Sequence, residues 1–217
     1  MPTHRITLVL ILSMAASYLH GAATDWPAYG NDLGSSKYAD LDQINAGNVA
    51  KLEIAWQWQS PDNALVKADP KKTPWGFKST PLKVGNVLYT STSLGHVAAI
   101  NAATGETIWV FDTRTYADGR PTNLGFNHRG VAYWSDSRGR SRIFMPTNNA
   151  YLWALDAATG QPIRDFGDAG RVDLTLGLGR PVDRQMYSVI SAPTVVAGVV
   201  IVGSSIMDGP KSKEMPP

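Results

Sequence analysis

The chain has 217 residues, of which 43% are hydrophobic and 18% are charged, and its formal net charge is +2. This balance excludes a disordered chain, which has few apolar residues and a strong charge imbalance, and it offers no concentrated basic face for nucleic acid. The lack of cysteine excludes disulfides, zinc–thiolate sites, iron–sulfur clusters and thiol catalysis. Twenty glycines, fourteen prolines and seven tryptophans instead indicate many turns between aromatic-rich strands.

The first 23 residues have the organisation of a secretory signal peptide. His4 and Arg5 give a short positive start, residues 6–16 form an apolar run, and small residues follow at 21–23. We expect cleavage after Ala23 and export to a bacterial periplasm. The alternative is a membrane anchor, but a bilayer span needs about 20 apolar residues. The mature chain is therefore expected to have no membrane span.

The chain after residue 80 contains an internal repeat. The segment VAAINAATGETIW at 97–109 returns as LWALDAATGQPIR at 152–164, fifty-five residues later. A second pair of similar segments is PLKVGNVLYTSTS at 81–93 and PTVVAGVVIVGSS at 193–205. Similarity at such a period indicates stacked units of supersecondary structure.

Each unit fits four short antiparallel strands, with Gly85-Asn86 as a tight turn able to adopt positive φ in the first unit. The strands expected in the first unit are 80–84, 87–92, 97–101 and 106–111. Those expected in the second unit are 131–134, 142–147, 151–156 and 162–166. The third unit supplies 192–196 and 199–204, and residues 52–58 are expected to form one strand of a further unit.

Four-stranded sheets repeated every roughly 40–55 residues are typical of a β-propeller. A parallel α/β fold would need helices between the strands, and no connection shows a 3.6-residue apolar period. A β-sandwich is the other alternative, and the repeated Ala-Ala-Thr-Gly turn argues against it. The expected fold class is all-β: a β-propeller of four-stranded antiparallel blades, with about two and a half blades present.

The repeated segment also resembles a known motif. The pattern A-x-N-x-x-T-G-x-x-x-W at 99–109 resembles the tryptophan-docking motif of the quinoprotein dehydrogenases, the pyrroloquinoline quinone (PQQ) enzymes. The second copy, at 154–164, keeps Ala, Asp, Thr and Gly but has Arg164 in place of the tryptophan. The opening DWPAYGNDLGSSKYADLDQINAGNVAKLEIAW at 25–56 is similar to the family's first segment.

Within the family, FKSTPLKVGNVLY at 77–89 and NHRGVAYW at 127–134 are most similar to the glucose-dehydrogenase-like branch. The family fold is an eight-bladed propeller. The resemblance therefore implies that residues 24–217 are the N-terminal portion of a propeller domain that is incomplete here.

The resemblance implies several cofactor-binding residues. Arg129 matches a family arginine that holds a cofactor carboxylate, and a planar, permanently charged guanidinium suits that role. Lys78 stands where many relatives carry a glutamate, and it could pair with a carboxylate or carbonyl oxygen of the quinone. His128 could donate to cofactor or substrate. For each of the three, the alternative is an incidental loop residue.

Further site residues follow from the same resemblance. Ser191 lies near a hydroxyl-bearing position of the relatives, although Ile190 competes for that alignment. Ser204 and Ser205 match a region that cradles the quinone, and Asp208 matches an acidic calcium ligand. An aspartate beside hydroxyls and carbonyls is chemically suited to Ca²⁺, but a solvated turn is the alternative. The family's catalytic base would lie beyond Pro217.

The function implied is periplasmic oxidation of a sugar or alcohol by hydride transfer to PQQ, with Ca²⁺ as Lewis acid and an aspartate as base. Electrons would pass to a cytochrome or to ubiquinone, and the 217-residue chain alone is expected to be inactive. The alternative is a non-catalytic periplasmic β-propeller that binds other proteins as a scaffold.

Overall fold

A computed structural model describes residues 25–32, 34–122 and 124–206 of the chain. The expected signal peptide and Asp208 lie outside the described residues. The helices are one short α-helix and three 3₁₀ turns: η1 (Val49–Lys51), α1 (Asp62–Ala68), η2 (Pro70–Lys72) and η3 (Thr115–Asp118). Over the described ranges, no helix has the length and apolar character needed to cross a bilayer.

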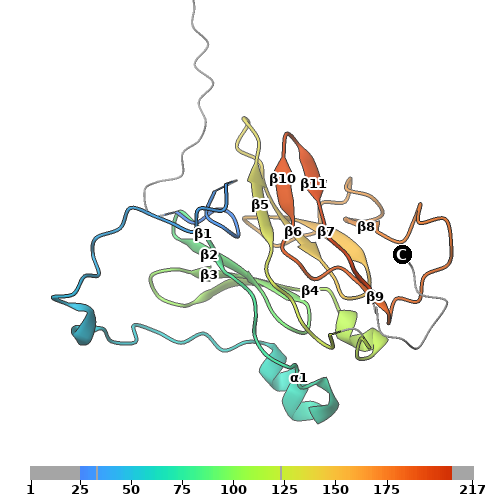
Figure 1. Cartoon of the computed structure of the whole chain (residues 1–217), viewed down its shortest axis with the longest axis horizontal. Coiled ribbons are helices and arrows are strands. Elements are labelled where there is room, and N and C mark those ends of the chain that lie inside the picture. Colours follow the sequence, from blue (N-terminus) through green and yellow to red (C-terminus); the bar gives the residue numbers. More distant parts are fainter. Residues whose placement is uncertain (1–24, 33, 123, 207–217) are drawn as a thin grey trace, which may run out of the picture.

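The first unit forms a four-stranded antiparallel sheet in the order β1-β2-β3-β4, which confirms the expected blade (Figure 1). Its strands are β1 (Leu82–Val84), β2 (Val87–Ser91), β3 (His96–Asn101) and β4 (Thr107–Asp112). Val84 pairs with Val87, so the predicted Gly85-Asn86 turn closes the first hairpin.

The second unit forms another sheet of the same kind, in the order β5-β6-β7-β8. Its strands are β5 (Ala132–Ser135), β6 (Ser141–Pro146), β7 (Tyr151–Asp156) and β8 (Arg171–Asp173).

The expected fourth strand at 162–166 is wrong, because Arg171–Asp173 takes the edge beside β7. Pro162 makes only an isolated bridge to Leu155, and Ile163 and Phe166 turn their side chains into a hydrophobic cluster.

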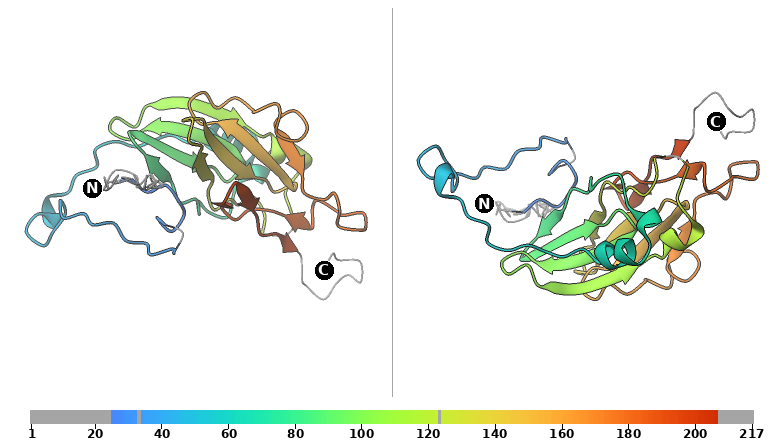
Figure 2. Two further views of the ribbon diagram at one scale, coloured as in Figure 1. Left: turned by 90° about the horizontal axis from the view of Figure 1, so that it is seen from above. Right: turned by 90° about the horizontal axis from the view of Figure 1, so that it is seen from below.

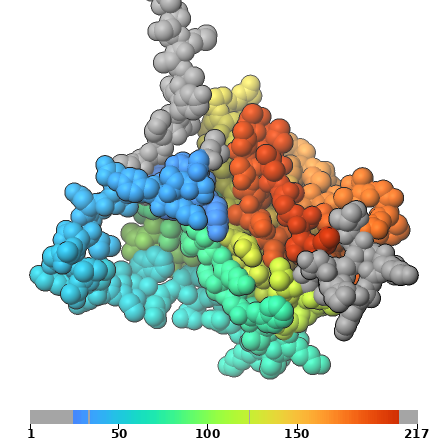
Figure 3. Space-filling view, in the orientation of Figure 1, coloured from blue at the N-terminus to red at the C-terminus, as the bar shows by residue number. Residues whose placement is uncertain are grey.

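The third unit is a hairpin of β10 (Thr194–Val196) and β11 (Val199–Ile201), beside a short pair formed by β9 (Tyr187–Ser188) and β12 (Ser205–Ile206). The strand expected at 52–58 is not formed within the part of the chain that the structure describes. No described strand pairs with this segment, and its Leu52 and Ile54 side chains are exposed. In Figure 3 the blue-to-cyan residues of this region form a lobe beside the sheets.

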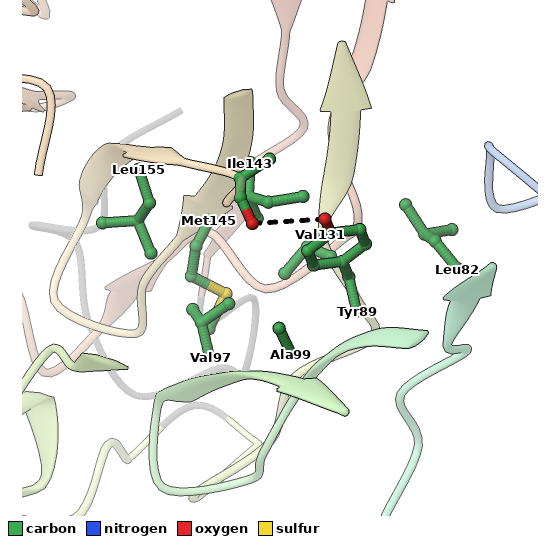
Figure 4. Close-up of a cluster of buried hydrophobic side chains, with 9 residues drawn as sticks. Leu82, Tyr89, Val97, Ala99, Val131, Ile143, Met145 and Leu155 are labelled. Carbon is green, nitrogen blue, oxygen red and sulfur yellow. Dashed lines mark hydrogen bonds between the residues drawn. The ribbon is translucent and has the colours of Figure 1, made fainter. Parts of the chain in front are cut away.

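The main core lies between the first two sheets, which are packed against each other (Figure 2). Figure 4 shows Tyr89, Val97 and Ala99 of the first sheet facing Ile143 and Met145 of the second. The Tyr89 hydroxyl donates to the carbonyl oxygen of Ala157 at 3.2 Å. Burial, and then the charges of Tyr133 and Asp156, raise the pKa of Tyr89 to about 12, so it stays a donor at ordinary pH.

The central strand β6 has buried side chains on both of its faces. Ile143 and Met145 face the first sheet, while Phe144 packs with Val195 and Val200 of the third unit. This arrangement explains the uninterrupted buried run from Ile143 to Pro146. Successive units are therefore stacked face to face, as in neighbouring blades of a propeller.

A tryptophan of the first sheet contacts the turn that follows β7 in the second sheet. The Trp109 indole donates to the carbonyl oxygen of Ala157 at 3.1 Å. Its ring covers Gly160, where an added Cβ would lie 2.5 Å from the ring atom Cε3. The turn is held by the Asp156 carboxylate, which accepts hydrogen bonds from the backbone of Ala158 and Thr159. This contact confirms the motif read at 99–109.

The same contact occurs once more on the first sheet, where the sequence did not predict it. The Trp56 indole donates to the carbonyl oxygen of Ala102 at 3.2 Å and covers Gly105, whose added Cβ would lie 2.6 Å from the ring. Trp58 donates to Thr107 at 2.9 Å. Residues 52–58 thus attach to the first sheet through tryptophan side chains instead of strand pairing.

Candidate functional site

Three segments that lead into the first strands of the three units lie side by side. The backbone N–H of Thr80 donates to the carbonyl oxygen of Arg129 at 3.2 Å. The N–H of Arg129 in turn donates to the carbonyl oxygen of Ile190 at 2.9 Å. Residues from about 78, 128 and 190 onward are therefore brought together although they are far apart in sequence. The resemblance had assigned candidate residues to all three segments.

Gly130 allows this close approach. An added Cβ would lie 3.2 Å from the carbonyl oxygen of Thr80 and 3.5 Å from Cβ of Ala192, and its φ of +139° is a value that side-chain-bearing residues rarely adopt. A larger residue would push the three segments apart. The glycine of the His-Arg-Gly sequence is thus required by the backbone of the site.

Two cations are presented by these segments. Lys78 and Arg129 are exposed, and neither forms an ion pair with a carboxylate of the described residues. Ser191, on the third segment, is exposed as well. A lysine, an arginine and a hydroxyl, each exposed on neighbouring segments, are donors of the kind suited to an anion with several carboxylates.

Ser79 fixes the first segment to the sheet. Its hydroxyl lies 3.1 Å from the hydroxyls of both Thr90 and Ser91, and it accepts a hydrogen bond from the Ser91 N–H at 3.3 Å. This network holds the residue next to Lys78 against the end of β2. The sequence did not predict this anchoring role of Ser79.

His128 is placed differently from the other candidates. Its side chain is 1% exposed, and neither ring nitrogen has a hydrogen-bond partner among the described residues. Burial lowers the pKa of His128 to about 4, an effect that the negative charge of Asp62 partly opposes. The imidazole is therefore neutral at ordinary pH and lies beneath the surface that carries Arg129.

The serines near residue 204 belong to the third unit. Ser205 begins β12 and is paired in register with Ser188, while Ser204 is exposed immediately before that strand. No hydrogen bond or backbone pairing of the described residues connects Ser204 to Arg129. Within the same ranges, no three His, Asp or Glu side chains are grouped so that they could hold a metal ion.

A buried carboxylate that the sequence did not reveal anchors the segment before β1. Asp62, at the start of α1, accepts hydrogen bonds from the Thr92 hydroxyl at 2.7 Å and the Leu94 N–H at 3.0 Å, and its Oδ1 lies 2.9 Å from His96 Nδ1. The Ser93 hydroxyl in the same turn donates to the carbonyl oxygen of Gly76 at 2.9 Å. These contacts hold the chain that leads to Lys78 on the β2–β3 turn.

The stacked four-stranded antiparallel sheets, joined by tryptophan contacts, define part of a β-propeller. Residues 26–217 match the family described as "PQQ: Glucose/ethanol/alcohol dehydrogenase, beta-propeller domain". The chain belongs to this family.

Among curated relatives, the chain is 32% identical to the quinate/shikimate dehydrogenase (quinone) of Acinetobacter baylyi, over 85% of this chain and 24% of that protein. It is 30% identical to quinoprotein glucose dehydrogenase A of Acinetobacter calcoaceticus, over 89% of this chain and 26% of that protein. The chain thus spans about a quarter of the length of these relatives.

Among solved structures, the quinohemoprotein alcohol dehydrogenase of Comamonas testosteroni matches with a TM-score of 0.68 and 30% identity, over 86% of this chain and 24% of that one. This likeness confirms the β-propeller fold and its partial extent.

Proposed function

We propose that the chain is the N-terminal part of a periplasmic quinoprotein dehydrogenase that oxidises a sugar or an alcohol and passes electrons to a cytochrome or to ubiquinone. The family match supports this function over a protein-binding scaffold. The observation that carries it is the backbone pairing of Thr80, Arg129 and Ile190, which brings together the segments that bear the exposed cations Lys78 and Arg129.

The donor set fits PQQ, which has three carboxylates. Arg129 would hold one carboxylate with its planar guanidinium, and Lys78 would pair with another carboxylate or a carbonyl oxygen as a compact charge. Ser191 and Ser204 would add neutral hydroxyl donors. The chemistry that such a quinone supplies when bound is acceptance of a hydride from the carbon of an alcohol.

The remaining assignments extend this proposal. We assign Asp208 as a ligand of Ca²⁺ and Ser205 as part of the quinone cradle, both on the resemblance of the segment 203–208. Residues 1–23 would direct the chain to the periplasm and be removed there. The length of the relatives supports a longer parent protein, in which further residues would supply the base.

Replacing Arg129 by alanine tests the site. We expect Arg129→Ala to raise the Kd for PQQ, measured in the complete protein with calcium, by about tenfold or more, because a charge-assisted bidentate contact is lost. Arg138→Ala is the matched control, since Arg138 is an exposed arginine on the turn between β5 and β6. Unchanged affinity in Arg129→Ala, or an equal loss in the control, would contradict the assignment.

A further inference from the structure

Four buried residues near the candidate site carry polar atoms that have no hydrogen-bond partner among the described residues. The Oδ1 of Asn127, both ring nitrogens of His128, both amide atoms of Asn148 and the hydroxyl of Ser188 have no hydrogen-bond partner within the described residues. These four side chains are only 1–3% exposed. A buried polar atom without a partner costs about 1–3 kcal/mol, so several of them together call for a ligand.

Backbone contacts place the four residues in one region of the interior. The backbone N–H of Arg129 donates to the carbonyl oxygen of Ile190 at 2.9 Å, and the N–H of Val189 donates to the carbonyl oxygen of Thr147 at 3.3 Å. The chain at 188–190 therefore runs between the segment 127–129 and the turn at 147–148. Asn127 and His128 come to it from one side and Asn148 from the other.

The chemistry of these atoms selects the ligand. The Ser188 hydroxyl, the Asn148 amide and a neutral imidazole can each both donate and accept, whereas Asn127 Oδ1 accepts. An anion would leave the acceptors unpaired, and a cation would leave the donors unpaired. Water donates two hydrogen bonds and accepts two, so it can serve both kinds of atom.

We propose that Asn127, His128, Asn148 and Ser188 form an internal water-binding site directly behind the backbone that carries Arg129. Buried waters make about three hydrogen bonds each, so about two waters would satisfy the six atoms. They would connect the second unit to the third unit in addition to the direct hydrophobic contacts between the two. This site stands independently of the proposed dehydrogenase function.

Whether Asn148→Leu lowers or raises the Tm of the protein tests the proposed water-binding site. If water satisfies Asn148, we expect Asn148→Leu to break its hydrogen bonds and to lower the Tm of the protein by about 2–4 °C. If the site is dry, the same substitution removes an unpaired polar group and raises the Tm. Asn63→Leu on the exposed side of α1 is the control, with a Tm within about 1 °C of the unmodified protein.

A crystal structure of the unmodified protein gives a second measurement. We expect water density within hydrogen-bonding distance of at least two of the four side chains. Density for an ion or a larger molecule, or a cavity without density, would overturn the proposal. Should Asn148→Leu not fold, Ser188→Ala removes a single hydroxyl and is judged by the same sign of the change in Tm.

Discussion

His128 shows how burial alone can fix the charge of a residue in this protein. Its imidazole is enclosed where the second and third units meet, and burial lowers its pKa from 6.5 to about 4. Asp62 acts in the opposite direction through its negative charge, but it is the weaker influence. The neighbouring Arg129 is exposed. Adjacent residues of one motif thus have opposite environments.

The burial of His128 predicts that stability falls as the pH drops from about 6.5 to about 4. In this range the unfolded chain binds a proton that the folded chain does not, so the free energy of unfolding rises with pH. The contribution of His128 to the free energy of unfolding changes by at most about 1.4 kcal/mol for each pH unit. Urea unfolding of the unmodified protein and of His128→Gln, compared across this range, checks the prediction. The same pH dependence in both proteins would contradict it.

The sequence could predict which segments meet at the candidate site, but not how each side chain is placed. Lys78, Arg129 and Ser191 precede the first strands of successive units, and equivalent positions in a repeat fall at one end of the sheets. The burial of His128 depends on segment 188–190 packing beside it, and no local pattern encodes that contact. Asn148 was overlooked for the same reason, because its surroundings come from another unit.

At the scale of strands, the sequence predicted all four strands of the first sheet and the first three of the second, and it missed the edge strand beside β7. Strands β2, β3, β6 and β7 each pair on both sides, and their apolar runs follow from burial between units. The edge beside β7 is decided instead by tertiary packing, which turns Ile163 and Phe166 inward and leaves the pairing to Arg171–Asp173. Residues 52–58 have strand-like composition but are held by Trp56 and Trp58.

The contact between Trp109 and Gly160 predicts a specific cost for a small substitution. Gly160→Ala should destabilise the protein by about 3 kcal/mol, because the new Cβ both occupies a φ of +70° and meets the ring at 2.5 Å. Gly139→Ala is the matched control, since its φ is +78° but no atom lies within 4 Å of the added Cβ. Gly139→Ala should lower the free energy of unfolding by about 1 kcal/mol.

Equilibrium unfolding in urea measures both values. Equal losses in Gly139→Ala and Gly160→Ala would mean that backbone strain, and not the tryptophan, makes the glycine necessary. A larger loss in Gly160→Ala that disappears when Trp109 is also replaced by a smaller residue would assign the difference to the ring contact.

In the whole molecule, two kinds of contact link successive parts of the chain. The first kind is made by tryptophans: Trp56 packs on the turn after β3 in the first sheet, and Trp109 packs on the turn after β7 in the second. The second kind is made by backbone hydrogen bonds at the candidate site, which join Thr80 to Arg129 and Arg129 to Ile190. The stacking of the units therefore also brings together the segments that carry Lys78 and Arg129, so the proposed site depends on the same arrangement as the fold.

The 217-residue chain alone is expected to show no dye-linked dehydrogenase activity after addition of PQQ and calcium. It spans about a quarter of the length of its quinoprotein relatives, and it presents the candidate cofactor residues from three units only. Within the described residues, its third unit comprises the β10–β11 hairpin and the short β9–β12 pair, and Val196, Val199 and Ile201 are exposed, whereas a full blade is one four-stranded sheet. Lys78 and Arg129 would then bind only part of the cofactor, without the surrounding residues that orient an alcohol for hydride transfer. Dye reduction is measured with a sugar and with a primary alcohol, and the complete protein serves as the positive control. Turnover by the 217-residue chain would show that these units suffice for catalysis and would overturn the expectation.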